Sequence, residues 1–152
     1  MRDGRLCLSR HWGYGRGMNG LALPLRDATD ALTEVSATPR LDAELLMAHA
    51  LGIDRSEMLL RQHDLDAPAG FAAMLARRVA DEPVAYITGM QAFWDLDLHV
   101  TPDVLIPRSD SETLIEVAMA SFAGRDAPAR ILDLGTGSGA LLLAGLSVFG
   151  DA

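Results

Sequence analysis

Apolar residues recur three and four positions apart between about residues 26 and 80, as they do on one face of a helix. The residues that follow this spacing are Ala28, Leu32, Val35, Leu41, Leu45 and Ala48. Thr38 followed by Pro39 is typical of the start of a helix, and Gly52 is typical of its end. The pattern predicts helices that bury these apolar residues.

Two further helices are predicted in the same stretch. Asp54 and Glu57 have the spacing of a capping box ahead of an apolar run. A fourth helix follows Pro68, and we expect Arg77 and Arg78 to point outward from it. Its apolar side is formed by Phe71, Met74, Leu75 and Val79.

The pattern changes at Pro83. Residues 95–100 alternate between polar and apolar side chains, which is typical of a half-buried strand. Two prolines flank residues 103–106, and we interpret this segment as the returning strand. The sequence therefore predicts a hairpin between residues 91 and 107.

A helix, a strand and a second helix are predicted after the hairpin. Ser109 and Glu112 have capping-box spacing, and the helix behind them is expected to bury one wide apolar stripe. The members of this stripe are Leu114, Ile115, Ala118, Met119 and Phe122. Residues 130–134 predict a short buried strand, which leads through a glycine-rich turn into the last helix. This order is typical of the opening of a doubly wound sheet.

The predicted fold class is α/β. It comprises a small helical bundle at residues 18–82, a β-hairpin linker at 83–108 and the incomplete N-terminal part of a doubly wound, Rossmann-like domain at 109–152. Residues 1–17 are rich in arginine and glycine and lack a signal-peptide pattern. We interpret them as a disordered leader upstream of the true start; a basic arm that touches RNA is the alternative.

The composition excludes or disfavours several classes of binding site and catalytic site. The 152 residues carry 13 basic and 21 acidic side chains, a net charge of −8, which argues against direct nucleic-acid binding. Every basic residue is arginine, so a Walker P-loop, a Schiff-base lysine and a Ser-Lys dyad are excluded. A single Cys7 cannot form an internal disulfide and points to the reducing cytoplasm. No apolar run reaches the roughly 18 residues of a membrane span.

The glycine-rich turn is the strongest chemical signal. Gly135, Gly137 and Ala140 fit the spacing of a dinucleotide-binding turn, so a nicotinamide or flavin cofactor is one reading. Asp133, two residues before the first glycine, would repel a pyrophosphate but would attract an ammonium group. The acid therefore favours S-adenosylmethionine, which has an amino-acid end and no phosphate. A turn without any ligand stays open as the third reading.

Other candidate residues carry weaker signals. Arg108 and the helix start behind it would frame one wall of a pocket, but the local pattern favours plain capping with Arg108 in solvent. Phe93 and Trp94 would offer an aromatic face to a substrate, although packing is the commoner role of such pairs. The histidines lack metal-ligand spacing among themselves or with Cys7, so no metal site is predicted.

Four motifs in order resemble the release factor N5-glutamine methyltransferases. They are residues 83–89 (PVAYITG), Phe93-Trp94, residues 105–108 (LIPR) with Glu112, and residues 131–139 (ILDLGTGSG). Residues 39–46 (PRLDAELL) look like the N-terminal domain of that family. The ribosomal-protein glutamine methyltransferases share much of this pattern.

The resemblance implies a cytoplasmic enzyme with a class I methyltransferase domain, expected to be monomeric. Such an enzyme would move a methyl group from S-adenosyl-L-methionine to the glutamine amide nitrogen in the GGQ motif of peptide chain release factors, a step in translation termination. By this analogy the helical domain docks the release factor, and Phe93 lies near the substrate glutamine. The residues that would bind the cofactor are Gly135, Thr136, Gly137, Ser138 and Gly139.

The resemblance also has departures. The Asn-Pro-Pro-Tyr motif of the family, which grips the glutamine amide, does not occur in the 152 residues, so no catalytic residue is assigned. The acid expected on the cofactor ribose is missing too. We therefore expect a chain truncated after its first cofactor motif and inactive alone. The alternatives are a non-catalytic release-factor-binding remnant and, less favoured, a piece of a dinucleotide-binding oxidoreductase.

Overall fold

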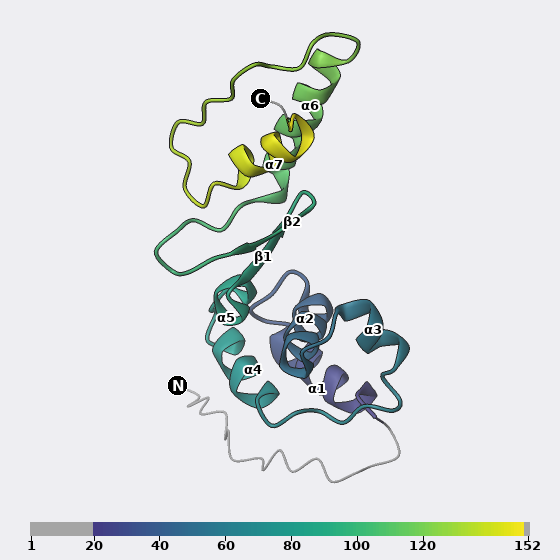
Figure 1. Cartoon of the computed structure of the whole chain (residues 1–152). Coiled ribbons are helices and arrows are strands. Elements are labelled where there is room, and N and C mark those ends of the chain that lie inside the picture. Colours follow the sequence, from purple (N-terminus) through teal and green to yellow (C-terminus); the bar gives the residue numbers. More distant parts are fainter. Residues whose placement is uncertain (1–19, 151–152) are drawn as a thin grey trace. The chain divides into compact units, whose positions relative to one another are not determined.

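The computed structural model of the chain describes residues 20–150, so the predicted leader at residues 1–17 lies outside the described part. Two compact units meet in sequence between Val84 and Ala85 (Figure 1). Within the described residues, the regular elements of the first are helices, and the second combines helices with a two-stranded sheet. This mixed content is compatible with the predicted α/β class.

Four helices build the first unit: α1 (Ala22–Leu32), α2 (Pro39–Leu51), α3 (Arg55–Leu60) and α4 (Phe71–Val79). The second helix contacts each of the other three, which places it at the centre of the unit (Figure 1). The core is formed by apolar side chains of the four helices and of Leu21. Its members, each at most 4% exposed, are Leu21, Leu25, Ala28, Leu32, Ala43, Leu46, Met47, Ala48, Met58, Phe71 and Leu75.

The helix boundaries follow local capping chemistry. Thr38 precedes α2 without a side-chain cap hydrogen bond, Pro39 fills the first position of the helix, and Gly52 ends it in the left-handed conformation with φ 70°. The carboxylate of Asp54 accepts a hydrogen bond from the backbone N–H of Glu57 at 3.0 Å, which caps α3. These predicted boundaries are confirmed.

The buried face of α2 differs from the predicted one. Leu41 and Leu45 are 40% and 37% exposed, whereas Asp42 and Glu44 are only 8% and 4% exposed. The prediction was wrong because it assumed that charged side chains mark the solvent side of a helix. Here both carboxylates find arginine partners that make their burial tolerable.

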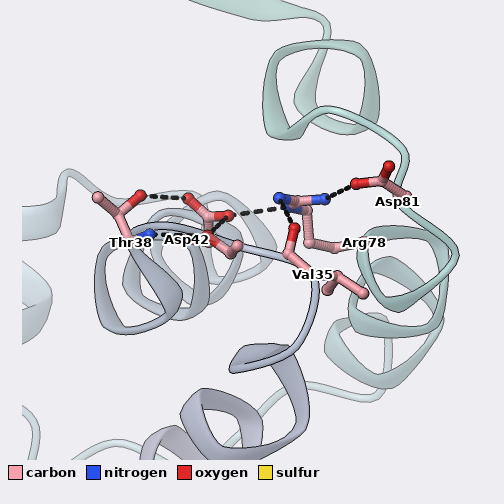
Figure 2. Close-up of polar contacts among 6 residues, drawn as sticks. Val35, Thr38, Asp42, Arg78 and Asp81 are labelled. Carbon is pink, nitrogen blue, oxygen red and sulfur yellow. Dashed lines mark hydrogen bonds and ion pairs between the residues drawn. The ribbon is translucent and has the colours of Figure 1, made fainter.

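Asp42 is the centre of the first of these networks (Figure 2). It accepts hydrogen bonds from Ser36 Oγ at 2.8 Å, from Thr38 Oγ1 at 3.3 Å and from Arg78 Nε at 2.8 Å. Arg78 also donates to the carbonyl of Val35 at 2.9 Å and pairs with Asp81. Its side chain is 11% exposed, so the expectation that Arg78 points outward was wrong.

Glu44 is the centre of the second network. Arg55 Nη2, at the start of α3, lies 2.7 Å from one carboxylate oxygen, and Arg40 Nε contacts the other. Burial alone raises the pKa of Glu44, but the hydrogen bonds and charges of the two arginines outweigh it and lower the pKa below its ordinary value. The ionised carboxylate therefore links α2 to α3.

The second unit contains α5 (Val84–Thr88), β1 (Met90–Phe93), β2 (Leu96–His99), a 3-10 turn η1 (Ser109–Ser111), α6 (Glu112–Phe122) and α7 (Ala140–Val148), although Val84 itself belongs to the first unit. Helices α6 and α7 contact each other (Figure 1). Its small core joins the hairpin to these two helices. The buried members are Phe93, Leu98, Ile115, Ala140 and Ala144.

The hairpin is present, but its second strand is not the predicted one. Strands β1 and β2 are antiparallel, and Phe93 pairs with Leu96 across a two-residue turn. Trp94 takes a φ of 57°, as the first central residue of a type II′ turn does. Residues 103–106 form no strand, and the partner of β1 is residues 96–99, which lie within the segment predicted as the first strand of the hairpin.

The predicted strand at residues 130–134 is absent from the described structure. A buried parallel strand needs hydrogen-bonded neighbours on its edges, and the segment has none among residues 20–150. Leu132 and Leu134 are accordingly 82% and 84% exposed. The wide stripe of α6 was also overestimated, since Ile115 is buried but Leu114 remains 60% exposed. Within the same described residues, no helix has the length and apolarity of a membrane span.

Candidate functional site

The glycine-rich turn bends through three left-handed residues. Gly135, Gly137 and Gly139 have φ values of 80°, 55° and 80°, which side chains with a Cβ rarely adopt. The N–H of Gly139 donates to the carbonyl of Thr136 at 2.8 Å, and Thr136 Oγ1 donates to the carbonyl of Asp133 at 3.1 Å. The turn therefore requires glycine for its backbone path and delivers the chain into α7.

A cavity of about 350 Å³ lies beside this turn. One wall consists of residues 105–108 together with Phe93 and Ser111. The other consists of Asp133, residues 135–138 and the first residues of α7, Ala140 and Leu141. Cavities that hold small molecules typically measure about 300–1,000 Å³, so this one lies at the small end of that range.

The predicted cofactor residues do not all line the cavity. Gly135, Thr136, Gly137 and Ser138 line the cavity. Gly139 does not, but it is the residue from which α7 starts. Most of the turn is exposed, so its backbone is accessible from solvent.

The packing role of Phe93 is confirmed, and its role beside a substrate stays a prediction. Phe93 is 1% exposed and belongs to the core of the second unit, and it also lines the cavity. The same is true of Ala140 at the start of α7. The cavity wall is therefore continuous with the core.

Glu112 has a different partner from the predicted one. The capping box is wrong: α6 begins after Ser111, no side chain caps it, and Glu112 Oε1 instead accepts a hydrogen bond from the N–H of Trp94 at 3.1 Å. Ser147 of α7 donates to Asp95 at 3.0 Å. The hairpin turn is thus held by both helices, next to the strand residue that lines the cavity.

The wall at residues 105–108 is anchored from the preceding segment. Tyr86 Oη donates to the carbonyl of Val104 at 2.7 Å, immediately before the wall begins. Arg108 and Ser111 lie on one wall of the cavity, as in the alternative that the sequence analysis favoured less than plain capping, whereas the apolar residues Leu105 and Ile106 were given no role at the site. In the described part of the chain, no group of three or more metal-ligating side chains converges.

Comparison with known proteins shows which family the chain is similar to. Residues 25–89 match the family model described as the PrmC N-terminal domain. The chain is 44% identical over 124 residues to a protein of Burkholderia pseudomallei named release factor glutamine methyltransferase. The predicted family resemblance is confirmed. Proteins of the same name from Coxiella burnetii and Escherichia coli are also 44% identical, over 129 and 123 residues.

The similarity to release factor glutamine methyltransferases covers most of this chain but not most of theirs. The three alignments include 80%, 80% and 79% of this chain, and 43%, 46% and 43% of the respective relatives. The chain therefore spans less than half the length of these curated relatives. The helices of the first unit lie largely within the matched PrmC N-terminal domain.

Proposed function

We propose that the chain contributes to a methyltransferase that uses S-adenosylmethionine to methylate the side-chain amide nitrogen of a glutamine in a peptide chain release factor. The observation that carries the proposal is the cavity beside the glycine-rich turn, in a chain similar to proteins of that name. Residues 109–152 would be the beginning of a Rossmann-like domain. Such an enzyme would work in the cytoplasm, where translation terminates.

The chemistry of the cavity fits the methionine part of S-adenosylmethionine. A backbone without Cβ atoms at Gly135 and Gly137 lets a ligand approach the turn closely. Asp133 lines the cavity, and its carboxylate would attract a ligand ammonium group and disfavour a pyrophosphate. Phe93 and Leu141 add apolar surface to the walls of the cavity.

S-adenosylmethionine supplies an electrophilic methyl group when bound. The protein has to bring the glutamine amide nitrogen, a poor nucleophile, into line with that group and to accept its N–H hydrogens. Phe93 lies on the cavity wall where it can support the substrate side chain. The residues expected to grip the amide, an Asn-Pro-Pro-Tyr sequence, do not occur among these 152 residues. We therefore expect this polypeptide to bind the cofactor without completing the transfer.

Binding of radiolabelled S-adenosylmethionine to the 152-residue chain tests the cofactor assignment. We expect retention of label that unlabelled S-adenosylhomocysteine displaces and NADH does not. Displacement by NADH alone would favour the oxidoreductase alternative, and failure to retain label would contradict the proposal. A single-turnover reaction with release factor tests the second part, since methyl label on its glutamine would overturn the expected inactivity.

A release-factor-binding role without catalysis is the second candidate. It is favoured by the helical unit, which has its own core and matches the PrmC N-terminal domain. We propose that this unit docks the release factor. Calorimetric titration of release factor into the chain separates the candidates: binding of release factor with no cofactor affinity would support the binding role alone.

A further inference from the structure

Two opposite charges line the cavity from different chain segments. Arg108 belongs to the wall at residues 105–108, and Asp133 precedes the glycine-rich turn. Among the described lining residues, these two carry the formal charges. A cavity with one positive and one negative side chain is suited to a ligand that itself carries both charges.

The backbone of Arg108 is held in place from both sides. Its carbonyl accepts a hydrogen bond from the N–H of Ser111 at 3.0 Å as the chain enters η1, and its own φ and ψ of −98° and 137° are extended. On the other side, the hydrogen bond from Tyr86 to Val104 fixes the start of the wall. The guanidinium is therefore presented by an anchored segment.

The guanidinium itself is available for a ligand. In the first unit, Arg40, Arg55, Arg61, Arg77 and Arg78 each hold a carboxylate. Across residues 20–150, no hydrogen bond or ion pair joins the Arg108 side chain to another residue, and Arg108 is exposed. Its guanidinium is thus not paired directly with a carboxylate of residues 20–150.

We propose that Arg108 binds the α-carboxylate of S-adenosylmethionine while Asp133 attracts the α-ammonium group. This inference rests on the proposed function and adds to it a residue that recognises the cofactor. A guanidinium donates two parallel hydrogen bonds that match a carboxylate. Arg108 and Asp133 lie on different walls of the cavity, so each could bind one of the two charges of the amino-acid end. A phosphate would gain from Arg108 but would be repelled by Asp133.

Decarboxylated S-adenosylmethionine, which keeps the ammonium and sulfonium groups, provides the test. Its affinity and that of S-adenosylmethionine are measured by calorimetry for the unaltered chain, Arg108→Ala, Arg108→Lys and the control Arg125→Ala. Arg125 is exposed and does not line the cavity. We expect Arg108→Ala to weaken S-adenosylmethionine about tenfold, because a charge-assisted hydrogen bond at an open site is lost.

The pattern across ligands distinguishes the outcomes. Arg108→Ala is expected to leave decarboxylated S-adenosylmethionine unchanged or tighter, and Arg108→Lys to keep part of the preference for the carboxylate. Equal weakening of both ligands would mean that Arg108 supports the wall only, and an unchanged affinity for both would mean that it has no role; either result overturns the inference. Binding of neither ligand to the unaltered chain would overturn the proposed function as well.

Discussion

Replacing Arg78 by Met tests whether the buried ion pair holds the helical unit together. Arg78 and Asp42 have side chains only 11% and 12% exposed, and Arg78 links α4 both to Asp42 of α2 and to the carbonyl of Val35 (Figure 2). Methionine keeps much of the apolar stem but removes the donors. The variant therefore isolates the polar contribution of this residue.

The expected loss follows from what remains around Asp42. Removing one partner of a buried pair costs about 3–5 kcal/mol, because it leaves a buried charge uncompensated. Asp42 keeps hydrogen bonds from Ser36 and Thr38, which lowers the cost. We expect Arg78→Met to reduce the free energy of unfolding by about 2–3 kcal/mol.

Urea denaturation followed by far-UV circular dichroism measures this loss. Arg61→Met is the matched control, because its partner Glu57 lies one turn earlier and both side chains are about half exposed, at 53% and 42%. Such a pair contributes at most about 0.5 kcal/mol. Adding Asp42→Asn to Arg78→Met should recover part of the loss by removing the stranded charge. Equal losses for Arg78→Met and Arg61→Met would refute the reasoning.

Three further predictions concern other parts of the chain. Because the pKa of Glu44 in the folded state is lowered from 4.5, the ionised carboxylate stabilises the fold above that pH, and this contribution is lost as the pH falls through the lowered pKa. Urea denaturation at neutral and acidic pH should therefore show that the free energy of unfolding of Glu44→Gln falls less with acidification than that of the unaltered chain. Glu112→Ala should cost about 1 kcal/mol and speed hydrogen exchange at the Trp94 amide, whereas the exposed Glu116→Ala on the same helix should leave that amide unchanged. Gly137→Ala and Gly124→Ala should each cost about 1 kcal/mol of stability, since both glycines have positive φ, but only Gly137→Ala should weaken S-adenosylmethionine binding in calorimetry.

Local chemistry made part of the fold predictable. The signals at Thr38, Gly52 and Asp54 depend on residues within one helical turn, so the helix boundaries could be predicted directly. The buried face of α2 could not, because the partner that makes Asp42 tolerable in the interior lies 36 residues later, at Arg78. A sequence pattern that counts only apolar positions has no means of pairing two distant charges.

The second unit departed from prediction for different reasons. The turn at Trp94 and Asp95 lacks the glycine or asparagine that usually marks a two-residue hairpin, so the returning strand was placed too late. Residues 130–134 have the composition of a strand, but a strand also needs a neighbour to pair with.

The candidate site was partly predictable. The glycine turn could be predicted from the sequence because its positive φ values require glycine. The wall that contains Arg108 could not be separated from ordinary helix capping, because Glu112 reaches across to Trp94, 18 residues earlier, rather than to its own helix start. Only the folded chain brings Arg108 and Asp133 to one cavity.

Photochemical cross-linking tests most directly whether the cavity binds S-adenosylmethionine. The radiolabelled cofactor is irradiated with the 152-residue chain, and trypsin, which has only arginine sites here, cuts after Arg108 and Arg130. We predict label in the peptide that begins at Ile131 and contains the glycine turn, or in the peptide that ends at Arg108, with loss of label in Gly137→Ala. Label confined to the helical unit, or label that Gly137→Ala leaves unchanged, would contradict the assignment of the cavity.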